Sequence, residues 1–82
     1  MILIEVDIPV LMRTYDFELD ENMESGDAAR EIASRVCRAL QCEMEDDPGR
    51  FMLWDRDRRR NLERGFTLYE NGVRNGSYLI LI

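Results

Sequence analysis

One amphipathic helix pattern, placed after two amphipathic strand patterns, constrains the fold of this chain most. Apolar side chains occupy every second position in residues 2–8 and again in residues 14–20, as in strands with one buried face. Pro9 favours a connection between them, so we expect an amino-terminal hairpin. Ser25 or Asp27 can accept hydrogen bonds from the free amides of a helix start, and an apolar stripe then runs to near Cys42. A helix with one such stripe can bury it only by lying across one face of a sheet.

The second half of the chain supplies the remaining strands. Residues 51–54 are a short apolar run between turn signals, and the sequence does not decide which alternate side chains face inward. Residues 55–61 are too charged for a core, so we expect an exposed turn there, followed by a very short strand at Leu62. Residues 66–76 end in two Asn-Gly pairs, which indicate compact turns. Residues 77–82 are apolar on both faces, which predicts a central strand parallel to the first.

Length and charge limit the function. With 82 residues there is room for a single domain, residues 1–82. The formal charge of −6 argues against nucleic-acid binding, which needs an excess of positive charge. All 11 basic residues are arginines, so no lysine is available for isopeptide modification. The chain shows neither a signal-peptide pattern nor an apolar stretch that spans a bilayer, so we expect a cytoplasmic protein without direct membrane insertion.

The carboxyl-terminal sequence resembles a known family. Thr67-Leu68, followed by the residues Gly72-Val73-Arg74-Asn75-Gly76-Ser77-Tyr78-Leu79-Ile80-Leu81, is similar to the stretch that completes the sheet in ubiquitin-like proteins. The resemblance implies an α+β, ubiquitin-like β-grasp: a mixed sheet of a β-hairpin and two to three further strands, with one helix across one face. In length and ending, the chain looks most like the small YukD-type proteins of bacterial type VII secretion loci.

This resemblance implies a cytosolic accessory component of the secretion apparatus that docks on the secretion ATPase or on membrane-channel subunits, and so lies peripheral to the inner face of the membrane. One alternative is a generic ubiquitin-like adaptor of another assembly, including a dimerising or oligomerising module. Another is a protein modifier or sulfur carrier. The printed sequence ends at Ile82 without the Gly-Gly tail that both activities need, so we expect neither.

Residues for catalysis or for a cofactor are scarce. The sequence has no histidine, which removes the usual neutral-pH base and the commonest metal ligand. Cys37 and Cys42 are five positions apart and suggest neither a disulfide framework nor a C-x-x-C site. Five carboxylates could be considered as cation ligands, but they lack the spacing and the turn glycine of a calcium loop: Glu45, Asp46, Asp47, Asp55 and Asp57. We therefore expect no enzyme, no cofactor and no metal site.

Two surfaces are candidates for protein binding. The first is a basic turn of four arginines, which either keeps the chain soluble or docks an acidic partner through forked contacts. The second is the sheet face opposite the helix, where exposed apolar side chains indicate a contact site unless a loop or a dimer mate covers them. The basic turn consists of Arg56, Arg58, Arg59 and Arg60, and the sheet face of Leu3, Trp54, Tyr78, Ile80 and Ile82.

Overall fold

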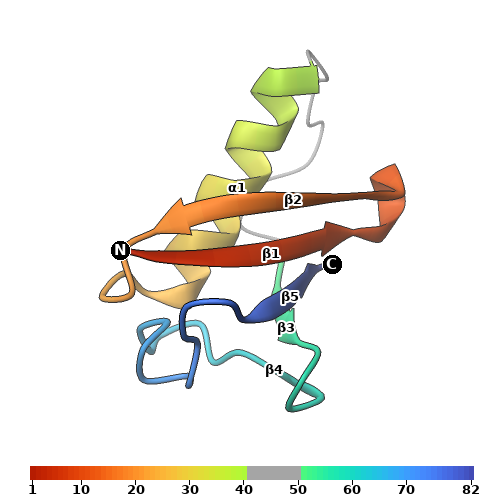
Figure 1. The fold of residues 1–82 in the computed structure, drawn as a ribbon. Helices are drawn as coiled ribbons and strands as arrows, with labels where there is room; N and C mark the ends of the chain where they lie inside the picture. Colours follow the sequence, from red (N-terminus) through yellow and green to blue (C-terminus); the bar gives the residue numbers. More distant parts are fainter. Residues whose placement is uncertain (41–50) are drawn as a thin grey trace.

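A computed structural model describes residues 1–40 and 51–82 (Figure 1). The chain begins with a hairpin, continues through one α-helix, and ends with three short strands. In order, the elements are β1 (Ile2–Ile8), the 3-10 helix η1 (Pro9–Leu11), β2 (Arg13–Leu19), α1 (Ser25–Leu40), β3 (Leu53–Asp55), β4 (Arg60–Asn61) and β5 (Tyr78–Leu81).

The strands form one mixed sheet in the order β2-β1-β5-β3-β4. The last strand, β5, lies between β1 and β3, parallel to β1 and antiparallel to β3. The prediction of a central final strand beside the first strand is confirmed. Because β5 has a paired strand on each side, its backbone is hydrogen-bonded along both edges, with Leu79 and Leu81 facing the helix and Tyr78 and Ile80 facing the opposite side.

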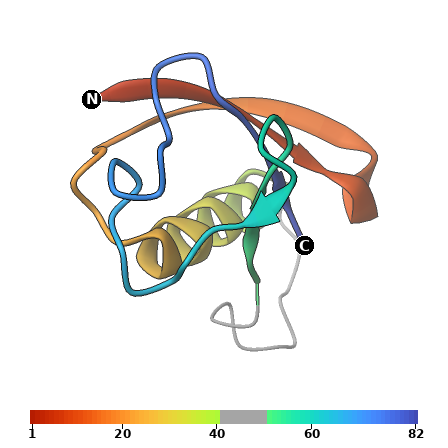
Figure 2. The same cartoon turned by 90° about the horizontal axis from the view of Figure 1, so that it is seen from below.

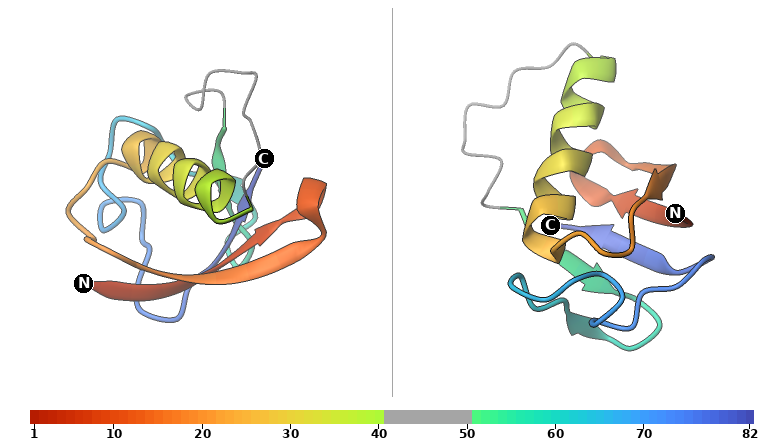
Figure 3. Two further views of the ribbon diagram at one scale, coloured as in Figure 1. Left: turned by 90° about the horizontal axis from the view of Figure 1, so that it is seen from above. Right: turned by 90° about the vertical axis from the view of Figure 1, so that its left-hand side faces the viewer.

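The helix lies across one face of this sheet (Figure 3). Every second residue of β1 is buried against it, together with Leu79 and Leu81 of β5. The buried side of α1 is built from small and branched residues, so the helix backbone can approach the strands closely. These helix residues are Ala28, Ala29, Ile32, Ala33 and Val36. The fold-class prediction, a mixed sheet with one helix on one face, is confirmed.

The register settles the orientation of β3. Leu53 pairs with Leu81 and is buried, whereas Trp54 pairs with Ile80 on the opposite face and is half-buried. Met52 precedes β3 and exchanges two backbone hydrogen bonds with Ile82, which extends the pairing by one residue. Even-numbered residues of this strand therefore point away from the helix.

The expectation of an exposed turn over residues 55–61 is wrong at both ends. Asp55 is the last residue of β3 and only 3% exposed, and one of its carboxylate oxygens accepts hydrogen bonds from the amides of Asp57 and Arg58. The buried carboxylate is therefore satisfied by the turn that follows it. Arg60 and Asn61 form β4, and Leu62, expected to be the short strand, is a buried residue directly after it.

The start of the helix also differs from the prediction. The sequence predicts that Ser25 or Asp27 accepts hydrogen bonds from helix amides, but the Ser25 hydroxyl instead donates to the carbonyls of Glu63 and Phe66. The backbone amide of Ser25 donates to the Phe66 carbonyl as well, and that of Gly26 to the Arg64 carbonyl. Figure 2 shows this segment of the chain beside the first turn of α1. Ser25 therefore joins the helix to the loop, a contact that no local pattern in the sequence indicates.

Some predictions fall outside the described residues. The helix is described as far as Leu40, so Cys42 and the acidic residues after it carry no structural statement. Cys37 lies in α1 and is half-buried.

Candidate binding surface

The sheet face that points away from α1, here called the outer face, collects most of the predicted apolar side chains. Trp54 and Ile80 are neighbours across the β3–β5 pair, and Tyr78 lies two residues before Ile80 on the same face. All three are half-buried. Leu3, at the start of β1, is 52% exposed, and Ile82 is 59% exposed just beyond β5. Alternation along the strands therefore places all five residues on the face opposite the helix.

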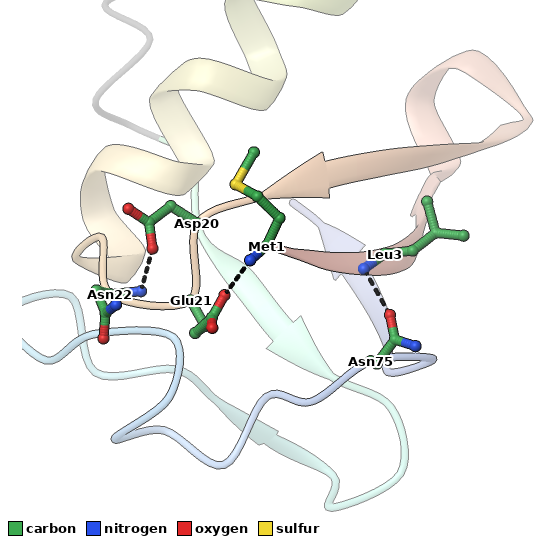
Figure 4. Close-up of polar contacts among 6 residues, drawn as sticks. All are labelled: Met1, Leu3, Asp20, Glu21, Asn22 and Asn75. Atoms are coloured by element: carbon green, nitrogen blue, oxygen red, sulfur yellow. Dashed lines mark hydrogen bonds and ion pairs between the residues drawn. The ribbon is translucent and has the colours of Figure 1, made fainter.

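Hydrogen bonds at the amino-terminal end of β1 hold the segment before β5 against this strand. The amide of Leu3 donates to the side-chain oxygen of Asn75 over 2.8 Å (Figure 4), and the Leu3 carbonyl accepts from the amide of Gly76. The amide of Glu5 donates to the carbonyl of Ser77. The segment before β5 is thus held along β1, and the position of Leu3 relative to Tyr78 is fixed by backbone contacts.

One arginine of the basic turn joins the outer face. The guanidinium carbon of Arg56 lies 4.6 Å from the centre of the Tyr78 ring, within the range of a cation–π contact. The Arg56 amide also donates to the Tyr78 carbonyl. The two surfaces predicted separately from the sequence therefore meet at this pair.

The other arginines of the turn are placed differently. Arg58 and Arg60 both donate from their guanidinium groups to the backbone carbonyl of Asn71. Arg59 is exposed and has a positive φ of 55°, so it forms the corner of the turn. The structure divides the basic turn: Arg56 stacks on the outer face, whereas Arg58 and Arg60 hold the loop before β5.

An acidic row on the outer face was missed in the sequence analysis. Four carboxylates share this face with the apolar residues, because the register of the hairpin pairs Glu5 with Asp16 and Leu3 with Glu18. Asp7, the fourth, accepts a hydrogen bond from the Thr14 hydroxyl opposite it. The polar positions of the two predicted strands contained this signal, but it appears as one row only when the strands are paired.

The ion pairs found among the described residues lie elsewhere. They join Asp27 to Arg30 and Glu31 to Arg35 on the helix, and the amino group of Met1 to Glu21 over 3.0 Å. Hydrogen bonding to Glu21 raises the pKa of the Met1 amino group. A hydrogen bond from its own backbone amide, and then the bond to the Met1 amino group, lower the pKa of Glu21. Within residues 1–40 and 51–82, the four outer-face carboxylates take part in no ion pair.

Neither a metal-binding cluster nor a membrane-spanning helix is present in residues 1–40 and 51–82. The described part of the chain holds no group of three or more His, Cys, Asp or Glu residues arranged to bind a metal ion. No helix among the described residues is both long and apolar enough to cross a bilayer.

Comparisons with known proteins identify the fold. No protein-family model matches the chain, and no curated protein does. Among solved structures, a ubiquitin-like domain of an Arabidopsis thaliana protein superposes with a TM-score of 0.71 at 16% identity, over 99% of this chain and 74% of that chain. A computationally designed protein based on human erythrocytic ubiquitin gives 0.71 at 23% identity, covering 100% and 90%. Caldiarchaeum subterraneum ubiquitin gives 0.67 at 24% identity, covering 99% and 90%. The chain therefore has the expected ubiquitin-like β-grasp fold.

Proposed function

We propose that this chain is a non-catalytic protein–protein interaction module and that the outer face of its sheet is the binding surface. The observation that supports this most directly is the cluster of Trp54, Tyr78 and Ile80, which face solvent together in adjacent strands. Exposed apolar clusters of this kind mark contact sites, and tryptophan and tyrosine are enriched among the residues that dominate binding energy.

The sheet behind these residues favours such a role. Trp54 and Ile80 lie on paired strands, and Tyr78 is held by the Arg56 side chain above its ring. Side chains on a paired sheet lose little conformational freedom when a partner binds, so more of the contact energy remains as affinity.

We further propose that the partner belongs to a bacterial type VII secretion apparatus, with the secretion ATPase or a membrane-channel subunit as the docking site. This assignment rests on the resemblance of the chain as a whole to the small YukD-type proteins. It implies a cytosolic module that is peripheral to the membrane through its partner.

The test is affinity capture from native extract of the source cells, with the wild type and Ile80→Glu in parallel and the retained proteins identified by mass spectrometry. Ile80 is half-buried on the outer face, so we expect the variant to fold and to lose its specific partners. Phe66→Glu is the matched control, because Phe66 is exposed beside the helix start, away from the outer face. Circular dichroism of each variant reports whether it is folded.

The outcomes separate the two levels of the proposal. Loss of secretion ATPase or channel subunits with Ile80→Glu, but not with Phe66→Glu, supports both. Specific partners of another assembly with the same pattern support the binding surface and contradict the secretion assignment. Equal retention by the folded Ile80→Glu variant contradicts the outer face as the binding surface.

A further inference from the structure

The outer face is divided into an acidic half and an apolar half. Strands β2 and β1 carry the four carboxylates, and β5 and β3 carry Trp54, Tyr78 and Ile80. The pairing of Asp7 with Ile80, and of Glu5 with Tyr78, places each half directly beside the other. Adjacent strands are about 4.8 Å apart, so the step from the β5 side chains to those of β2 is about 10 Å. That distance matches the diameter of an α-helix.

The acidic half carries an electrostatic cost within this chain. Glu5 and Asp16 are directly opposite each other on the same face, and like charges in that position destabilise a sheet. No cation in the described residues pairs with either of them, and Arg56 is placed over Tyr78 instead. The repulsion between Glu5 and Asp16 weakens the hairpin, and no contact among the described residues offsets it. Such a cost to stability is expected at a surface whose side chains are kept for binding a partner.

We propose that the outer face binds a basic amphipathic segment of a partner protein, with its apolar side on Trp54, Tyr78 and Ile80 and its lysine or arginine side chains over the acidic row. This inference rests on the proposed function and adds the chemistry of the partner. Both halves of the face are then used: the apolar contacts supply affinity, and the carboxylates select against neutral or acidic segments.

Charge excludes the other obvious occupants of this face. A second copy of the chain has a formal charge of −6 and would bring its own acidic row to the interface. In a two-fold pairing through this face, each copy would bring four carboxylates and, among the residues that the structure describes, one arginine stacked on the face, Arg56. Nucleic acids and anionic lipid surfaces are repelled for the same reason.

The test is an NMR titration of the ¹⁵N-labelled full chain with a synthetic peptide of about 18 residues that has leucine along one helical face and lysine on the other. A peptide of the same pattern with glutamate in place of each lysine is the control ligand. We expect the lysine peptide to shift amide signals of β2, β1, β5 and β3, the strands that carry the two halves of the face, and the glutamate peptide to leave them unchanged. Raising the salt concentration weakens the binding, because the exposed charges are screened.

A charge-neutral variant of the chain separates binding from folding. Glu5→Gln combined with Asp16→Asn removes the opposed charges without changing side-chain size, so its thermal midpoint is expected to rise. Its affinity for the lysine peptide is expected to fall about tenfold, the effect of losing two exposed charge contacts. Glu31→Gln, on the helix, is the matched control and should leave the affinity unchanged.

The outcomes distinguish this inference from the function on which it rests. Equal binding of both peptides, or unchanged affinity of the double variant, overturns the basic partner but leaves the apolar binding surface in place. Absence of shifts on the outer face with the lysine peptide overturns the inference as well. The proposed function itself is tested separately by the capture experiment, in which equal retention of partners by the folded Ile80→Glu variant contradicts it.

Discussion

The buried side chain of Asn71 joins segments that are far apart in the sequence. It is 5% exposed, and its side-chain oxygen accepts a hydrogen bond from the Glu63 amide over 2.8 Å. Its amide nitrogen lies within hydrogen-bonding distance of the Ser25 hydroxyl and of three loop carbonyls, those of Glu63, Phe66 and Thr67. One asparagine thus ties the first turn of the helix to the loop that precedes β5.

We predict that Asn71→Ala lowers the free energy of unfolding by about 1–3 kcal/mol, because the Glu63 amide loses its acceptor and the loop carbonyls each lose one of their donors. Asn61→Ala is the matched control: Asn61 is exposed in β4, so the change is expected to stay within about 0.5 kcal/mol. Urea denaturation followed by Trp54 fluorescence measures both. Equal effects of the two substitutions would show that the Asn71 contacts add nothing to stability.

The sequence predicted a turn at Asn71-Gly72 but not this role of the asparagine. The two Asn-Gly pairs predict compact turns, and the positive φ values in them belong to the glycines, Gly72 and Gly76, at 87° and 88°. The side chain of Asn71 could turn inward because the glycine carries the turn. Its partners come from residues 25 and 63–67, and a local pattern contains no information about contacts at that separation.

The helix α1 depends on small residues on its buried side. Ala28, Ala29 and Ala33 are all almost completely buried against the sheet. The apolar spacing of this segment predicted the helix and its buried stripe, because one face of a helix repeats every three to four residues. What the spacing did not show is how closely the helix lies to the strands, since that depends on the packing of side chains from both layers.

We predict that Ala33→Leu destabilises the protein by about 1–3 kcal/mol, because the added carbon atoms have no free space at a fully packed position. Ala39→Leu places the same substitution on an exposed position of the same helix and is expected to change stability by no more than about 0.5 kcal/mol. Both variants are compared by thermal unfolding monitored by circular dichroism. If Ala33→Leu is as stable as the wild type, the helix is not close-packed on the sheet at this position.

The short strands β3 and β4 were harder to place than the hairpin or the helix. With three and two residues, they are too short for alternation to define their bounds or their buried side. Their position comes from pairing: Trp54 pairs with both Ile80 and Asn61, and Asp55 is buried because the turn after it satisfies its carboxylate. Contacts along the sheet, not local hydrophobicity, determine this edge.

The molecule as a whole follows from the order of its elements more than from any single motif. Two amphipathic strands, one amphipathic helix and a final strand that is apolar on both faces were enough to predict the mixed sheet and its central strand. Alternation also predicted that Leu3, Tyr78 and Ile80 share the outer face, but it left the side of Trp54 open until the β3–β5 register placed it. The acidic row and the contact between Arg56 and Tyr78 could not be predicted, because both depend on which strands are neighbours and in which register.

The amino-terminal end of β1 is where distant parts of the fold converge. The amino group of Met1 pairs with Glu21 in the connection between β2 and α1, while Leu3 contacts Asn75 before β5 (Figure 4).

The pKa of the Met1 amino group is raised above 8.0, so its contribution to stability is fully present below pH 8.0 and is lost as the pH rises through the raised value. The pKa of Glu21 is lowered below 4.5, so its contribution is present above pH 4.5 and is lost as the pH falls through the lowered value. The ion pair between Met1 and Glu21 therefore makes its full contribution to stability between about pH 4.5 and pH 8.0.

We predict that Glu21→Gln returns the pKa of the Met1 amino group toward 8.0, because the neutral amide removes the charge that holds the proton. An NMR titration of the signals of Met1 and Ile2, on protein without an amino-terminal extension, measures this pKa. Glu24→Gln is the control, since Glu24 is not among the groups that shift the amino group. Met1 is exposed and Glu21 is only half-buried, so the effect on stability is expected to be small and to decrease with added salt. An unchanged pKa in Glu21→Gln would mean that this contact does not hold the start of β1 against the β2–α1 connection in solution.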